Sequence, residues 1–290
     1  LLSVLHFHSL IEALEYVPSL LEHKPFSLEL IDQRIIEMGR LSPALRNKLD
    51  WLEGKPEALL VFEIEASSLS SLEEKKEQFE KWAKEKKLSY KRSYLHSLEE
   101  QSFVWTLRKS GLGLLLSRRS YSRAIAFIED LSVAPEKLAP FIAALQSYLK
   151  KKGKTAGMYG HASVGLIHIR PYMDLREESE IEELLEMIND ITDLVLSFGG
   201  ALTGEHGDGL LRSYLHKKLF GDKIYQAFLD VKNIFDPHRL MNPHKMVEAP
   251  IPGKNLRLSP EHKIQEIPTF LDFKKEGGFS LSVDLCNGNG

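Results

Sequence analysis

The stretch that organises this chain reads Tyr159-Gly160-His161-Ala162-Ser163-Val164-Gly165-Leu166-Ile167-His168, inside a strand-like run from Thr155 to Pro171. On one unbroken strand, His161 and His168 would point to opposite faces, because their positions differ by an odd number. A turn at residues 163–165, where Gly165 takes a positive φ cheaply, would place the two imidazoles on adjoining strands instead. The stretch therefore predicts a turn with two converging histidines.

A second polar cluster reads Thr203-Gly204-Glu205-His206-Gly207-Asp208-Gly209. Glu205 can join His161 and His168 as a third ligand. Two imidazoles and one carboxylate leave open positions on a catalytic divalent metal such as Zn²⁺, Mn²⁺ or Fe²⁺. His206 then suits a base, since an imidazole titrates near neutral pH. The alternative is that these residues have no catalytic role. One of the two histidines would then be structural in a hairpin and the other exposed, and the loop from Gly204 to Gly209 would be a helix C-cap and turn.

Two arginines are candidates for holding a substrate carboxylate, which a guanidinium grips through two parallel hydrogen bonds. Arg108 is the polar group of an otherwise apolar helix face. Arg170 follows His168 by two positions, so the side chains of Arg170 and His168 point the same way on a strand. An ordinary surface salt bridge is the alternative for either arginine.

Strand and helix patterns alternate along the rest of the chain. Strands are expected at residues 2–7, 26–31, 58–66, 88–95 and 124–133, and helices at residues 10–21, 33–38, 71–87, 99–110, 135–152, 177–198 and 215–234. Ser9 and Asp32 are expected N-caps, and Gly39 fits the end of a helix. This order predicts an α+β domain, an antiparallel sheet covered by helices on one side. Residues 249–290 change character and read as a linker.

The composition narrows the class of protein. Among 290 residues, 43% are hydrophobic and 27% charged, the mix of an ordinary globular protein. A net charge of −3 gives no sign of a nucleic-acid partner, and no apolar run of about 18 residues predicts a membrane span. The single cysteine, Cys286, excludes an internal disulfide framework and favours a reducing, cytoplasmic compartment. The start lacks a signal peptide and an initiator Met, so we expect a piece of a longer protein.

Three segments resemble, in motif order, the C-terminal, substrate-side domain of flavin-linked 2-hydroxy-acid dehydrogenases. These belong to the vanillyl-alcohol-oxidase-like superfamily and include D-lactate dehydrogenases, glycolate oxidase and D-2-hydroxyglutarate dehydrogenase. The segments are Tyr159–His168, Gly204–Gly207, and Phe235-Asp236-Pro237 to Asn242-Pro243. The resemblance covers most of residues 1–248. It implies a ferredoxin-like cap domain that packs on an upstream FAD-binding domain, which this chain lacks.

The resemblance also assigns roles. The family's metal ligands correspond to His161, His168 and Glu205. His206 matches the catalytic base, Arg108 matches an arginine on the substrate carboxylate, and Asn242 lies in a closing motif near the flavin. The implied reaction oxidises a D-2-hydroxy acid to a 2-oxo acid by hydride transfer to FAD, and this chain alone is expected to be inactive. A metal-dependent hydrolase and a non-catalytic small-ligand-binding domain stay open as alternatives.

The chain departs from the family pattern at several positions. Residues 163–166, Ser-Val-Gly-Leu, replace Gly-Asp-Gly-Asn, which removes an Asp and an Asn. Ile128 stands where relatives carry a substrate-contacting Lys, Arg170 where some have Asn, and His244 where Gly is usual. A different substrate, or a different grip on its carboxylate, is the inference.

The end of the chain carries one more resemblance. Residues 286–288, Cys-Asn-Gly, resemble the opening of an iron–sulfur extension in relatives that fuse an electron-transfer unit to this domain. We therefore expect an iron–sulfur domain downstream, with an electron acceptor at the inner membrane. A cluster needs several cysteine thiolates, so this chain, with one, cannot hold it.

Overall fold

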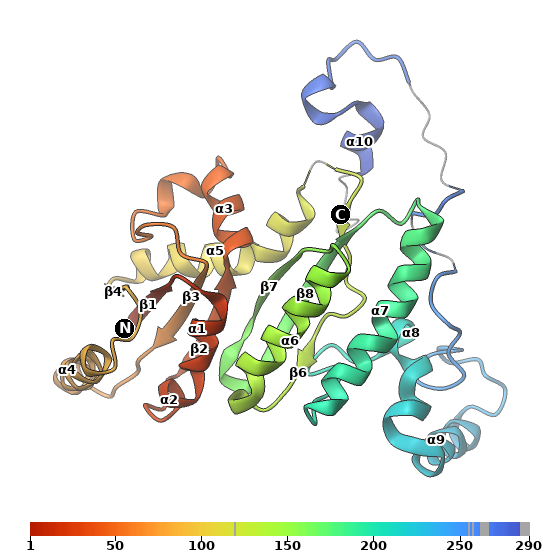
Figure 1. Cartoon of the computed structure of the whole chain (residues 1–290), viewed down its shortest axis with the longest axis horizontal. Helices are drawn as coiled ribbons and strands as arrows, with labels where there is room; N and C mark the ends of the chain where they lie inside the picture. The colour runs from red at the N-terminus through yellow and green to blue at the C-terminus, as the bar shows by residue number, and fades with distance from the viewer. Residues whose placement is uncertain (119, 255, 257, 262–266, 285–290) are drawn as a thin grey trace.

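An antiparallel sheet forms the centre of the molecule (Figure 1), in a computed structural model that describes residues 1–118, 120–254, 256, 258–261 and 267–284. The strands are β1 (Leu2–Phe7), β2 (Ser27–Asp32), β3 (Ala58–Glu63), β4 (Lys91–Leu95), β5 (Arg123–Ala124), β6 (Leu131–Ser132), β7 (Ala156–His161) and β8 (Leu166–Met173). They follow the order β4-β1-β3-β2-β7-β8-β5, and β6 also pairs with β8. The order of the first four strands is that of a ferredoxin-like βαββαβ unit. The expected α+β class is confirmed.

Helices connect the strands and extend beyond them. The α-helices are α1 (Leu10–Glu15), α2 (Val17–Leu21), α3 (Gln33–Leu41), α4 (Leu69–Glu85), α5 (Leu98–Leu116), α6 (Leu138–Lys151), α7 (Glu178–Ser197), α8 (Gly209–Arg212), α9 (His216–Phe235) and α10 (Phe279–Asp284). Short 3-10 helices are η1 (Arg46–Lys48), η2 (Pro135–Lys137), η3 (Ala162–Val164), η4 (Ser213–Leu215) and η5 (Lys274–Glu276). Ser9 and Asp32 cap α1 and α3 as expected, through bonds to Glu12 N and Ile35 N.

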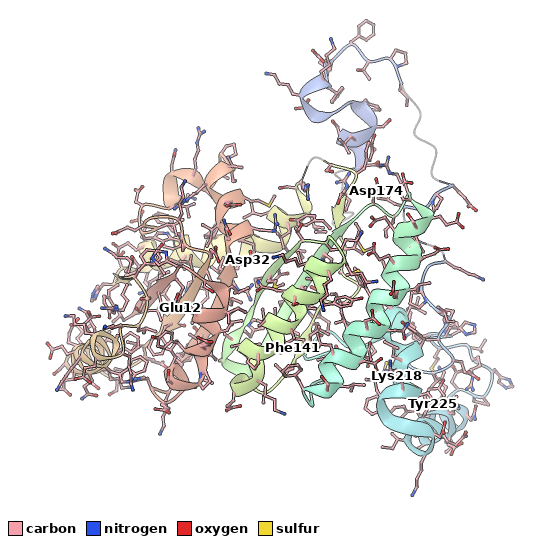
Figure 2. The ribbon with its side chains drawn as sticks, in the orientation of Figure 1. Glu12, Asp32, Phe141, Asp174, Lys218 and Tyr225 are labelled. Atoms are coloured by element: carbon pink, nitrogen blue, oxygen red, sulfur yellow. The ribbon has the colours of Figure 1, made fainter. Side chains whose placement is uncertain are left out.

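Helices cover both faces of the sheet, not the single face that was expected. Leu5 and Phe7 of β1 lie in a core with α1, α2, α4, α6 and α7, whereas Leu2 and Val4 lie in a second core with α3 and α5. The reason is that β1 and β3 carry apolar residues on both faces, so both faces need cover. Phe141 of α6, labelled in Figure 2, is fully buried in the larger core.

Two local expectations were wrong. Residues 124–133 do not form one strand, because β5 and β6 are two-residue strands and Asp130, with a φ of 70°, turns the chain between them. Gly39 does not end α3, which runs to Leu41. A Cβ at Gly39 would lie 2.6 Å from Leu107 Cδ1, so this glycine lets α3 and α5 approach each other. The described part of residues 249–284 contains the short η5 and α10.

Candidate active site

The hairpin of β7 and β8 brings the first two histidines together. η3 and Gly165, whose φ is 69°, form the turn between the strands, as the glycine spacing predicted. A Cβ at Gly165 would lie 1.8 Å from the carbonyl oxygen of Val133, so only glycine fits this position. The register pairs Tyr159 with His168, so His161, two residues further along β7, lies on the same face as His168, and the two rings have centroids 5.8 Å apart. Both imidazoles therefore face one region of the molecule.

Asp130 holds the loop that carries the Glu-His pair. Its buried carboxylate accepts hydrogen bonds from Thr203 Oγ1 at 2.7 Å, His206 N at 2.8 Å and Glu205 N at 3.1 Å. Burial would raise the pKa of Asp130, but these donors bring it below its usual value. The sequence reasoning missed this residue, and the adjacent acids at 129 and 130 were its only signal.

Glu205 is the point on which three imidazoles converge. Its carboxylate lies 3.3 Å from His161 Nε2, 3.4 Å from His168 Nε2 and 3.0 Å from His206 Nε2. The structure thus brings together all four residues that the sequence suggested for metal binding and proton transfer. Glu205 and His206 are 38% and 44% exposed, so a small molecule can reach them.

The two hairpin histidines differ in their electrostatic surroundings. Burial, assisted by the neighbouring charges of His206 and Arg108, lowers the pKa of His168 to about 3. His168 is therefore neutral at physiological pH, the form that binds metals. A hydrogen bond from Nδ1 of His161 to Glu29, at 2.7 Å, raises the pKa of His161.

Both candidate arginines lie at the edge of this cluster, and each is paired with a buried carboxylate. Arg108 Nη2 lies 2.8 Å from Glu29 Oε2, and its guanidinium lies over the ring of Tyr159 at 4.8 Å. Arg170 Nη2 contacts Glu129 Oε1, while its buried Nε has no hydrogen-bond partner among the residues that the structure describes. The sequence reasoning had identified neither glutamate.

Asn242 stands apart from the cluster, in the exposed loop after α9. It has a φ of 43°, and its side chain lies 3.4 Å from Lys245 Nζ. The same loop is attached to the site region by His216, which contacts Met246 O at 2.7 Å and Asp208 Oδ2 at 2.8 Å.

The donor set fits a divalent metal. Among the described residues, Asp130, His168, Glu205 and His206 offer ligand atoms within 4.8 Å of one another. His161 is not one of these four, but its Nε2 lies 3.3 Å from Glu205, whereas the oxygens of Asp130 already accept hydrogen bonds from the loop that it holds. Two imidazoles and a carboxylate then match a catalytic site with open positions.

A hollow of about 570 Å³ lies elsewhere. It is lined by residues that include Asp32, Arg34 and Lys150, and none of the cluster residues belongs to it. Its carboxylate, Asp32, is used to cap α3. The chemistry of the donor set, not the size of a cavity, therefore identifies the candidate site.

Within the described ranges, none of the helices has both the length and the apolar character needed to cross a bilayer.

Comparison with known proteins agrees with the motifs. Residues 2–246 match the family model described as FAD linked oxidases, C-terminal domain. The chain is 28% identical to a D-2-hydroxyglutarate dehydrogenase of Pseudomonas putida, over 98% of the chain and 29% of that protein. It is 26% identical to a D-lactate dehydrogenase of Archaeoglobus fulgidus, over 77% of the chain and 46% of that protein.

A solved structure shares the fold. The 4-ethylphenol oxidase from Gulosibacter chungangensis, in an isoeugenol complex, superposes with a TM-score of 0.54 at 10% identity, covering 84% of this chain and 53% of that one. The chain spans less than a third of the Pseudomonas putida relative, so the domain is one part of proteins of that size. Since the family model matches most of its length, the chain belongs to the C-terminal domains of FAD-linked oxidases.

Proposed function

We propose that this domain forms the substrate side of an FAD-dependent dehydrogenase that oxidises a D-2-hydroxy acid of the lactate, glycolate or 2-hydroxyglutarate type to a 2-oxo acid. The observation that carries the proposal is the convergence of three imidazole Nε2 atoms on the Glu205 carboxylate. A hydroxy acid offers a hydroxyl and a carboxylate, and the cluster with its neighbouring arginines offers partners for both. The names of the relatives support the same substrate class.

His161, His168 and Glu205 would hold a divalent metal such as Zn²⁺. When bound, such an ion polarises an oxygen ligand and lowers the pKa of a hydroxyl. His168 suits the role because it stays neutral, and His161 because Nε2 faces the centre of the site.

His206 is the proposed base. It is 44% exposed and lies next to Glu205 in sequence, with its Nε2 3.0 Å from that carboxylate. A substrate hydroxyl at the centre of the cluster would be within reach of this imidazole, which takes the hydroxyl proton.

Arg108 and Arg170 are the proposed carboxylate grip. The bonds of Arg108 to Glu29 use two of its five N–H groups, at Nε and Nη2. Arg170 is paired with Glu129 through Nη2, one of its three guanidinium nitrogens. Such donors hold the substrate so that its α-hydrogen faces the flavin, and orientation of this kind lowers a barrier by several kcal/mol, on the order of a hundredfold or more in rate.

Further parts of the proposal lie outside this chain. FAD would be bound mainly by another domain of the full-length protein, with Asn242 near it, and would accept the electrons. The enzyme would be cytoplasmic, and an iron–sulfur domain would pass the electrons to an acceptor at the inner membrane. Cys286, on which the iron–sulfur expectation depends, lies outside the described residues. The isolated chain would be inactive.

The test is His206→Ala in the full-length protein, assayed with D-2-hydroxy acids and an artificial electron acceptor. Loss of the base should lower kcat by about 10²–10⁴-fold. The matched control is His96→Ala, which removes an exposed histidine that directly follows β4, the edge strand at the other end of the sheet from β5. Unchanged turnover in His206→Ala would remove this residue from the mechanism. Metal-dependent hydrolysis without flavin, or binding without turnover, would favour the two alternative functions.

A further inference from the structure

We propose that Glu29 is a positioning residue that fixes the tautomer and orientation of His161, so that Nε2 of this ring faces the metal. The inference rests on the proposed metal site and adds a residue to it. Glu29 lies outside the motifs that define the site, on β2 near the start of the chain.

The geometry places one carboxylate between two partners. Glu29 of β2 lies directly opposite His161 of β7 in the antiparallel register, so their side chains stand on the same face of the sheet. Oε1 of Glu29 is 2.7 Å from His161 Nδ1, and Oε2 is 2.9 Å from Arg108 Nε. The Glu29 side chain is 11% exposed, so water competes little for these bonds.

These contacts decide which nitrogen of the ring bears the proton. A carboxylate paired with a guanidinium accepts hydrogen bonds and donates none, and Glu29 forms such a pair with Arg108, whose Nη2 lies 2.8 Å from Glu29 Oε2. At 2.7 Å, Nδ1 of His161 therefore donates to Glu29, and this contact is shorter than the 3.3 Å from Nε2 to Glu205. In the neutral ring the single proton then stays on Nδ1, and the lone pair of Nε2 is available to a metal held between this nitrogen and Glu205. Carboxylates that hold metal-binding histidines in this way raise the basicity of the ligand and fix its ring.

The other hairpin histidine lacks such a partner. Nδ1 of His168 is 3.6 Å from Glu129 Oε1, beyond hydrogen-bond distance, and is buried without a partner. That oxygen of Glu129 is already taken by Arg170. The positioning role therefore belongs to Glu29 and does not extend to Glu129.

Glu29→Gln separates this role from a general one in stability. A glutamine has a single acceptor oxygen, which Arg108 requires because a guanidinium only donates. The amide NH₂ then faces His161 and donates to Nδ1, which moves the ring proton to Nε2. The variant keeps the size of the side chain but blocks the nitrogen that binds metal. The control is Glu63→Gln on β3, which changes a carboxylate whose partner is Ser27 Oγ, at 2.8 Å.

Two measurements on the 290-residue chain test the proposal. Imidazole ¹⁵N NMR at pH 9 without metal should show Nδ1–H for His161 in the wild type and in Glu63→Gln, and Nε2–H in Glu29→Gln. Zn²⁺ affinity, measured by competition with a chromophoric chelator, should fall by about 10–100-fold in Glu29→Gln only.

The outcomes are distinguishable. A wild-type His161 with its proton on Nε2, or Zn²⁺ affinity that is equal in Glu29→Gln and the wild type, overturns the inference. A wild type that shows Nδ1–H but binds no Zn²⁺ overturns the metal part of the proposed function and leaves the role of Glu29 in holding the ring. If Glu29→Gln does not fold, the wild-type tautomer decides.

Discussion

Replacing Gly165 by alanine should damage the turn on which the candidate site depends. Gly165 has a φ of 69°, and a Cβ there would lie 1.8 Å from the carbonyl oxygen of Val133. A real Cβ needs more than 3 Å from such an atom, so the backbone must move by over an ångström. The movement would also stretch the hydrogen bond from Val133 N to Gly165 O, now 3.0 Å.

The cost can be divided into two parts. Alanine in the left-handed region costs about 1–2 kcal/mol by backbone sterics alone. The forced shift adds roughly 1–3 kcal/mol of overpacking and about 1 kcal/mol for the weakened hydrogen bond. Gly165→Ala should therefore lower the free energy of unfolding by about 3–6 kcal/mol.

Gly153→Ala isolates the first part. Gly153 has a φ of 65°, but a Cβ there would meet no atom within 4 Å, so only the backbone term of about 1–2 kcal/mol remains. Urea unfolding followed by circular dichroism measures both losses. Equal losses in the two variants would refute the argument that the Val133 carbonyl makes glycine obligatory at the turn.

Three further changes have defined outcomes. Asp130→Asn keeps a residue that tolerates positive φ but removes the negative charge that accepts the hydrogen bonds from Glu205 N and His206 N. The free energy of unfolding in urea should fall by about 2–3 kcal/mol, and amide hydrogen exchange at residues 205–206 should become faster. Unchanged exchange would contradict this. Arg92 and burial of the pair act in opposite senses on Glu80, and the hydrogen bonds from Arg92 prevail, lowering the pKa of Glu80 to about 2. Because this folded-state pKa lies below the unfolded value, the pair stabilises above about pH 4.5 and loses that effect as pH falls toward 2. Arg92→Gln should thus flatten the acid side of a stability-against-pH curve by about 1–2 kcal/mol, and an unaltered curve would argue against the pair. Ser97→Ala breaks a capping box at the start of α5 and should lower the free energy of unfolding by about 1 kcal/mol, which calorimetry detects as a lower melting temperature. An unchanged melting temperature would show that the cap does not stabilise the domain.

Local signals predicted the elements and the turn. The cap at Ser9, the cap at Asp32 and the glycine at position 165 each act within a few residues, so their effects are visible in the sequence. The run 124–133 failed because it was apolar enough for a strand, yet its Asp130 turns toward a loop more than 70 residues away. A partner at that distance leaves no periodic pattern.

The candidate site divides in the same way. Its four central residues come from two short motifs, and their types and spacing indicate metal and proton chemistry from the sequence alone. The glutamates that pair with the arginines could not be found in this way. Glu29 and Arg108 are 79 residues apart, and they meet only because α5 packs against the face of the sheet that includes β2.

The paired arginines also change how the departures from the family pattern are understood. Arg170 stands where some relatives have Asn, which suggests a different grip on the substrate carboxylate. In the structure its Nη2 is bound to Glu129, beside His168, so much of its charge is already balanced inside the protein. A buried pair of this kind is costly to break, because either partner alone would be an uncompensated charge. A substrate carboxylate at Arg170 would therefore have to bind an N–H group other than the one on Glu129 and leave the bond to Glu129 in place.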